Sequence, residues 1–150
     1  MKEFFEMIEK DHDEVKDIIV KLEESSSGAV KTREKMFMQL KEELIPHMKA
    51  EEKTLYPALK DQKESRMQAL EALEEHHVAE MVFKELEAAP KNEDVWMAKL
   101  KVFKELLEHH IEEEEDQIFK MAQETLESDK MSQIMEAFQQ EKEKVKKKIS

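Results

Sequence analysis

The sequence contains no cysteine, so the chain can form neither a disulfide nor a metal site with thiolate ligands. Any metal that it binds must be held by nitrogen and oxygen atoms, which excludes cysteine-ligated iron–sulfur clusters. A run of about twenty apolar residues, the length that spans a bilayer, is also missing. Charged residues interrupt the first segment too early for a secretory signal, and we therefore expect a cytoplasmic protein with no membrane partner.

Glycine and proline are scarce as well, with one glycine and three prolines in 150 residues. Charged residues, dominated by glutamate and lysine, make up 41% of the chain. This composition is typical of long helices with solvated outer faces, and the length suits one core. We therefore predict an all-α protein. Its formal net charge of −12 argues against a nucleic-acid partner, because phosphate backbones would be repelled.

Apolar residues recur at spacings of three and four, the repeat of a helix that buries one face. The pattern predicts helices over about residues 2–24, 30–59, 66–88, 92–126 and from 128 onward. Pro46 should kink the second helix, Pro57 should end or bend it, and Asn92 is a candidate N-cap for the fourth. For the lysine-rich residues 142–148 we expect a frayed, solvated end of the fifth helix.

A His-x-x-x-Glu motif occurs twice, from His47 to Glu51 and, 63 residues later, from His110 to Glu114. A residue and its i+4 neighbour share one face of a helix, so each histidine can bind an ion together with its glutamate. Both pairs fall on the apolar faces of their helices, where an isolated carboxylate is costly unless it pairs, protonates or coordinates a metal. The two motifs therefore predict a buried cation.

Each motif follows a helix that carries a histidine on its apolar face. The first helix aligns with the third at an offset of 64 residues, which superimposes His12 on His76. The chain is thus predicted to contain two related helical hairpins, each with one single histidine and one His-x-x-x-Glu motif. His77 and His109 lie off the apolar face in this register, and they remain the alternatives to His76 and His110.

Inward-facing side chains on four helices would form a di-metal centre of the kind that helical bundles build. The candidate ligands are His12, His47, Glu51, His76, His110 and Glu114. Six ligands are too many for one zinc ion and too few to saturate two octahedral metals, so we expect Glu51 and Glu114 to bridge two ions. Imidazole-rich ligation without sulfur favours iron, with manganese, zinc and copper as alternatives.

The order and spacing of these residues resemble the hemerythrin-like family, the HHE cation-binding domains, over about residues 2–126. The resemblance implies an antiparallel up-down four-helix bundle, here residues 1–127. The apolar pattern adds a C-terminal helix and lysine-rich tail over residues 128–150. The resemblance also implies two non-haem iron ions, oxo- or hydroxo-bridged, that bind dioxygen or nitric oxide.

The chain departs from the oxygen-carrying hemerythrins at two places. Those proteins have a second histidine four residues after the first on the third helix, and an aspartate five residues after the last histidine. Glu80 and Glu114 replace these features here. Glu80 is therefore a candidate seventh metal ligand, and another anionic ligand argues against simple reversible oxygen carriage.

These observations favour a di-iron protein that binds or senses dioxygen or nitric oxide, or that handles iron. A di-iron oxidase or a peroxide-consuming enzyme is one alternative, and a metal-free helical interaction module is another. The redox partner and the oligomeric state stay open. Glu52, Glu113 and Glu115 are predicted to belong to the acidic exterior, and Tyr56 is a candidate to reach a polar group beside the ligands.

Overall fold

The computed structural model describes residues 2–149, so Met1 and Ser150, the outermost residues of the two predicted domain ranges, lie outside it. The described residues form helices and short connections, with no strand among them. The helices are α1 (Lys2–Glu24), α2 (Val30–Lys53), α3 (Leu55–Lys60), α4 (Arg66–Ala88), α5 (Asp94–Glu113), the π-helical turn η1 (Glu114–Ile118), α6 (Phe119–Thr125) and α7 (Ser128–Ile149).

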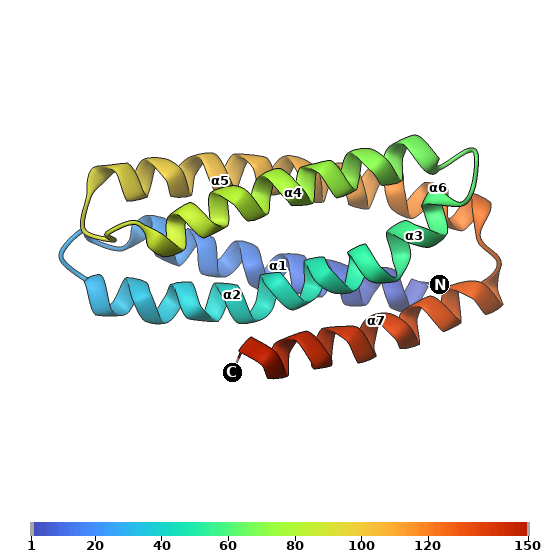
Figure 1. Cartoon of the computed structure of the whole chain (residues 1–150), viewed down its shortest axis with the longest axis horizontal. Helices are drawn as coiled ribbons and strands as arrows, with labels where there is room; N and C mark the ends of the chain where they lie inside the picture. The colour runs from blue at the N-terminus through green and yellow to red at the C-terminus, as the bar shows by residue number, and fades with distance from the viewer. Residues whose placement is uncertain (1, 150) are drawn as a thin grey trace.

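Four rods form an antiparallel bundle (Figure 1). Successive rods run in opposite directions: α1, then α2 with α3, then α4, then α5 with η1 and α6. The additional helix α7 packs along α2. The predicted all-α fold, an up-down four-helix bundle with a further C-terminal helix, is confirmed.

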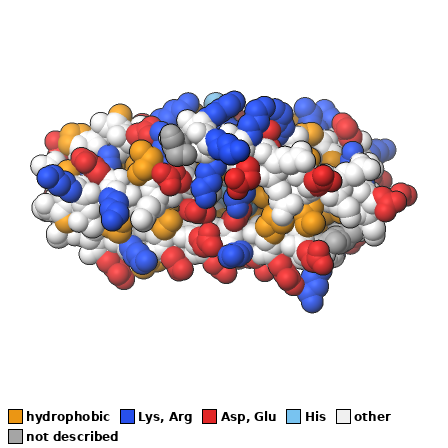
Figure 2. All heavy atoms as spheres, turned by 90° about the horizontal axis from the view of Figure 1, so that it is seen from below, with side chains coloured by type: hydrophobic (Ala, Val, Ile, Leu, Met, Phe, Trp, Pro, Cys, Tyr) orange, Lys and Arg blue, Asp and Glu red, His pale blue; other side chains and the backbone are white. Residues whose placement is uncertain are grey.

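Charged side chains of both signs are interspersed over the surface seen from below the bundle (Figure 2). This solvated exterior agrees with the charged outer faces that the composition predicts. Across residues 2–149, no helix combines the length and the apolar character needed to cross a membrane.

The second rod does not run unbroken to residue 59, because α2 ends at Lys53. Pro57 accounts for this break: it has no N–H to donate to the Lys53 carbonyl, and its ring crowds that oxygen. Thr54 closes α2, since its N–H and its hydroxyl both donate to the Ala50 carbonyl, over 3.0 and 2.6 Å. Pro46, where we expected a kink, lies inside α2 without interrupting it.

The rod predicted over residues 92–126 is also interrupted, by the π-helical turn η1 between α5 and α6. A π turn inserts one extra residue into an α-helix, and such turns are frequent at functional sites. This turn begins at Glu114, one of the predicted metal ligands. The prediction of Asn92 as the N-cap is wrong: Glu93 occupies that position, and its side chain makes no capping hydrogen bond.

The C-terminal helix is packed onto the bundle. It is helical through Ile149, so the expectation of a frayed end at residues 142–148 is wrong. Its residues Met131, Ile134 and Phe138 are buried in a hydrophobic cluster together with residues of α1, α3 and α6. Burial of this apolar face is what holds α7 against the rods.

Two hydrophobic clusters fill the interior, one towards each end of the rods. One includes residues of α3, α6 and α7, and the other includes residues of α5 such as Trp96. On α1, Ile8 belongs to the first cluster and Val15 to the second, with His12 between them. The predicted ligands therefore form a polar layer across the middle of the core.

Candidate metal centre

The structure brings the six predicted ligands together in this polar layer. His12 lies on α1, His47 and Glu51 on α2, His76 on α4, His110 on α5, and Glu114 at the start of η1. All six residues are buried, with exposed fractions of 0–5%. The helical repeat explains this placement, because the two members of each His-x-x-x-Glu motif lie about one turn apart on the buried face.

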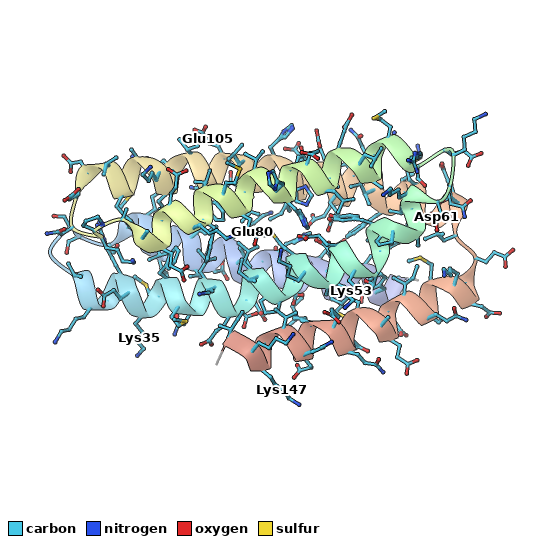
Figure 3. All side chains as sticks on the ribbon, in the orientation of Figure 1. Lys35, Lys53, Asp61, Glu80, Glu105 and Lys147 are labelled. Carbon is cyan, nitrogen blue, oxygen red and sulfur yellow. The ribbon has the colours of Figure 1, made fainter. Side chains whose placement is uncertain are left out.

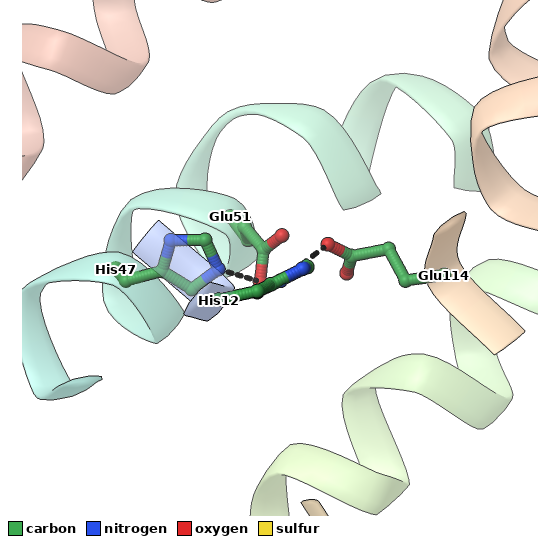
Figure 4. Close-up of side chains that lie close together, drawn as sticks. All are labelled: His12, His47, Glu51 and Glu114. Atoms are coloured by element: carbon green, nitrogen blue, oxygen red, sulfur yellow. Dashed lines mark ion pairs between the residues drawn. The ribbon is translucent and has the colours of Figure 1, made fainter. Parts of the chain in front are cut away.

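The ligand atoms form two groups, each with two imidazoles and two carboxylates, and within each group they all lie within 4.8 Å of one another. The first group, drawn in Figure 4, contains His12, His47, Glu51 and Glu114. His12 Nε2 lies 3.3 Å from a Glu114 oxygen, and His47 Nε2 lies 3.3 Å from a Glu51 oxygen. One carboxylate thus faces each imidazole.

The second group joins the same two carboxylates to the histidines of the other hairpin. His76 Nε2 lies 3.4 Å from Glu51, and His110 Nε2 lies 3.4 Å from Glu114. The two Nε2 atoms are 3.0 Å apart. Glu51 and Glu114 therefore stand between two pairs of imidazoles.

On the far side of every imidazole, a carboxylate accepts a hydrogen bond from Nδ1. The pairs are His12 with Glu115 at 2.7 Å, His47 with Asp11 at 2.9 Å, His76 with Glu52 at 2.9 Å, and His110 with Glu75 at 2.8 Å. An ionised carboxylate can only accept, so each Nδ1 carries a proton and each Nε2 faces the middle of the layer. Metal-binding histidines are oriented in this way by their outer partners.

Two of these outer carboxylates, Glu52 and Glu115, were predicted to lie on the acidic exterior, and the structure places them beside the ligands instead. Their side chains are only 24% and 29% exposed, and both hold candidate ligands. The other two outer carboxylates, Asp11 and Glu75, were not among the residues predicted from the sequence. A signal for Asp11 was present, because it lies on the apolar face of α1, three residues after Ile8.

Three other candidates lie outside both groups. Glu80 on α4 (Figure 3) forms an ion pair with Lys49 at 2.8 Å. His77 is exposed, and His109, also exposed, lies 2.9 Å from Glu113. The apolar pattern therefore identified the inward-facing histidine of each His-His doublet.

Tyr56 projects from α3 into the ligand layer, a direction that the sequence did not fix. Its side chain is buried, and its hydroxyl donates a hydrogen bond to Glu114. The hydroxyl oxygen also lies 3.4 Å from Glu51, 3.3 Å from His110 Nε2 and 3.5 Å from His76 Nε2. Burial and the charges of the two glutamates raise the pKa of Tyr56 well above its usual value, so the hydroxyl keeps its proton.

Comparison with known proteins agrees with this geometry. The sequence pattern of the hemerythrin HHE cation binding domain matches residues 3–122, most of the chain. The chain belongs to this family. A crystal structure of an HHE cation-binding domain-containing protein from Mycobacterium kansasii, described as an Rv2633c homolog, has the same fold, with a TM-score of 0.80. The two share 23% identity over 96% of this chain and 87% of that one.

No curated protein sequence matches the chain significantly. The identity to the Mycobacterium kansasii protein is low enough that the likeness establishes the fold alone.

The two buried glutamates of the HHE domain require positive charge nearby. Burial alone would lower the pKa of His47, but the charge of Glu51 and hydrogen bonds with Asp11 and Glu51 raise it to about 10. Burial would lower the pKa of His110 as well, but hydrogen bonds with Glu114 and Glu75 raise it to about 10. Protons on the imidazoles, or metal ions in their place, balance the carboxylates.

The residues present fit a pair of metal ions. Within the described part of the chain, three buried side-chain atoms make no hydrogen bond: His47 Nε2, Glu51 Oε2 and Glu114 Oε1. His47 belongs to the first ligand group, and Glu51 and Glu114 belong to both. Buried polar atoms without a hydrogen bond are costly, and coordination to a metal would satisfy them.

A small cavity adjoins the ligands on the side of the hydrophobic cluster that contains Trp96. Its volume is about 10 Å³, room for about one water-sized molecule. Apolar side chains make up half of its wall: Val15, Leu44, Met48, Leu107 and Ile111. The HHE domain therefore offers a confined, largely apolar space directly beside its candidate metal ligands.

Proposed function

We propose that this HHE domain binds two non-haem iron ions in its polar layer. The imidazoles of α1 and α2 would hold one ion and those of α4 and α5 the other, with Glu51 and Glu114 between them. The observation that carries this proposal is that both carboxylates belong to both ligand groups. Each carboxylate has two oxygens, so it can offer one to each ion.

The donor set supports iron. Each ion would have two imidazole nitrogens and two carboxylate oxygens from the protein, fewer than the six ligands of an octahedral ion. Histidine and carboxylate ligands with open positions are typical of non-haem iron proteins. Glu80 stays outside the proposed ligand set, because Lys49 binds its carboxylate.

We infer that the iron pair binds or senses dioxygen or nitric oxide, or that the domain handles the iron itself. Bound iron would supply open coordination positions and one-electron chemistry for a diatomic gas. The role of the chain is to hold the ligands and to keep water away, since Val15, Leu44 and Leu107 line the adjoining cavity. That cavity, of about 10 Å³, admits only a very small molecule.

Metal analysis and optical spectroscopy of the purified full-length chain test the proposal. We expect two iron ions per chain and a visible absorption that changes reversibly when the reduced protein meets dioxygen or nitric oxide. A chain that takes up no stoichiometric iron after anaerobic loading with ferrous ion would contradict the proposal and support the metal-free interaction module.

The Tyr56 hydroxyl favours a second candidate function, that of a di-iron oxidase or a peroxide-consuming enzyme. It keeps its proton and lies within hydrogen-bond distance of both central carboxylates, so it can donate a hydrogen bond to an oxygen of dioxygen or peroxide held beside them. Catalytic turnover of hydrogen peroxide by the iron-loaded protein would support this candidate. Reversible gas binding without turnover would support the first.

Replacing Tyr56 with phenylalanine should leave two iron ions bound, at an affinity about 10–100-fold lower. The hydroxyl orients Glu114, and the loss of an outer partner of a metal ligand has an effect of about this size. The ring is kept, so the packing of α3 should not change. Competition with a chelator measures the affinity, and an unchanged value would show that the hydroxyl does not support the carboxylates.

A further inference from the structure

The C-terminal helix α7 reaches the proposed metal centre through a lysine. Lys142 Nζ donates to both oxygens of Asp11, at 2.7 and 2.8 Å. Asp11 in turn accepts a hydrogen bond from His47 Nδ1 at 2.9 Å. Phe138, one turn before Lys142, packs edge-on against the same imidazole, with ring centroids 5.7 Å apart. A continuous series of contacts therefore joins α7 to one candidate ligand.

Asp11 differs from the other three outer carboxylates in its burial. Its side chain is 6% exposed, whereas those of Glu52, Glu75 and Glu115 are 24–29% exposed. Water and salt screen the partly exposed acids, but they screen a buried carboxylate much less. The charge of Asp11 would therefore act strongly on His47 unless a fixed cation offset it.

Two neighbouring acids add negative charge beside Asp11 and increase the need for a cation there. Asp11, Glu14 and Glu43 each place a carboxylate oxygen within 4.8 Å of the others. Two lysines of α7 face them: Lys142 binds Asp11 directly, and Lys146 lies 3.9 Å from Glu43. Of the two lysines, Lys142 is thus the one placed to act on the carboxylate that holds a candidate ligand.

We propose that Lys142 is a positioning residue that offsets the charge of Asp11 and thereby limits the electron donation of His47 to its metal ion. This inference rests on the proposed iron pair. Without the lysine charge, Asp11 would attract the Nδ1 proton more strongly, and the imidazole would become a more electron-rich ligand. Added negative character beside the metal favours ferric over ferrous iron, which lowers the reduction potential. Loss of the Asp11 charge should therefore raise the reduction potential.

The test compares the reduction potentials of iron-loaded full-length variants. Lys142→Gln removes the charge but keeps a hydrogen-bond donor, and we expect its potential to lie below that of the unsubstituted protein. Asp11→Asn should raise the potential. The double variant should follow Asp11→Asn, because Lys142 acts through that carboxylate. Lys142→Arg keeps the positive charge and should have the same potential as the unsubstituted protein.

Lys146→Gln is the matched control, since it removes a lysine charge from the same helix one turn further on. The inference is overturned if Lys142→Gln gives the same potential as Lys146→Gln, or shifts it in the same direction as Asp11→Asn. Should Lys142→Gln fail to fold, Asp11→Asn decides alone, and a potential that does not rise overturns the inference.

Iron content separates the two possible failures. Fewer than two iron ions in the unsubstituted protein would contradict the iron pair itself. Two ions per chain with no difference between Lys142→Gln and Lys146→Gln would contradict only the role of Lys142.

Discussion

Replacing Glu114 with glutamine is expected to reduce the iron content of the purified protein from two ions per chain to none. Glu114 belongs to both ligand groups, so the substitution removes an anionic ligand from each proposed ion. The amide has nearly the same shape and can still accept a hydrogen bond from Tyr56. Loss of iron would therefore reflect the missing charge and the missing second oxygen. Metal analysis after anaerobic loading with ferrous ion gives the stoichiometry.

Glu113→Gln is the matched control for this variant. Glu113 is the preceding residue in the chain, but its carboxylate pairs with the exposed His109 and lies outside both buried groups. The control should retain two iron ions. If Glu114→Gln kept one ion per chain, Glu114 would serve a single ion, and the shared arrangement of carboxylates would be incorrect.

Replacing Phe138 with alanine is expected to lower the free energy of unfolding of the metal-free protein by about 3–5 kcal/mol. The ring is fully buried where α7 meets the bundle, 5.3 Å from the ring centroid of Phe4, and the change would leave a cavity. Urea denaturation followed by circular dichroism measures the difference.

The neighbouring exposed residue provides the control for that experiment. Gln139→Ala removes a side chain from the solvent face of the same helix, and it should change the free energy of unfolding by no more than about 0.5 kcal/mol. Equal stability of the two variants would mean that α7 contributes little to the core, contrary to the packing described above.

The candidate ligands could be predicted because helical periodicity alone decides which residues share a buried face. His12 and His76 lie on the apolar stripes of their helices, and the same stripes distinguish His76 from the exposed His77. The two His-x-x-x-Glu motifs add a fixed spacing on the other two rods. With four such faces in a bundle, convergence of the six side chains follows from the pattern.

The remainder of the site depends on where helices break and on how they pack. Pro57 indicates a break in the second rod, but only the structure gives the direction of α3 and hence the position of Tyr56. The π turn at Glu114 carries no comparable signal in the sequence. The contact between Lys142 and Asp11 joins residues 131 positions apart, and no periodicity within one helix could reveal it.

Anomalous X-ray diffraction at the iron edge, from crystals of the iron-loaded full-length protein, tests the central claim most directly. The account predicts two iron peaks inside the bundle, one beside His12 and His47 and the other beside His76 and His110, with Glu51 and Glu114 reaching both. A single peak, or peaks bound only at the surface while these side chains remain paired with one another, would contradict it.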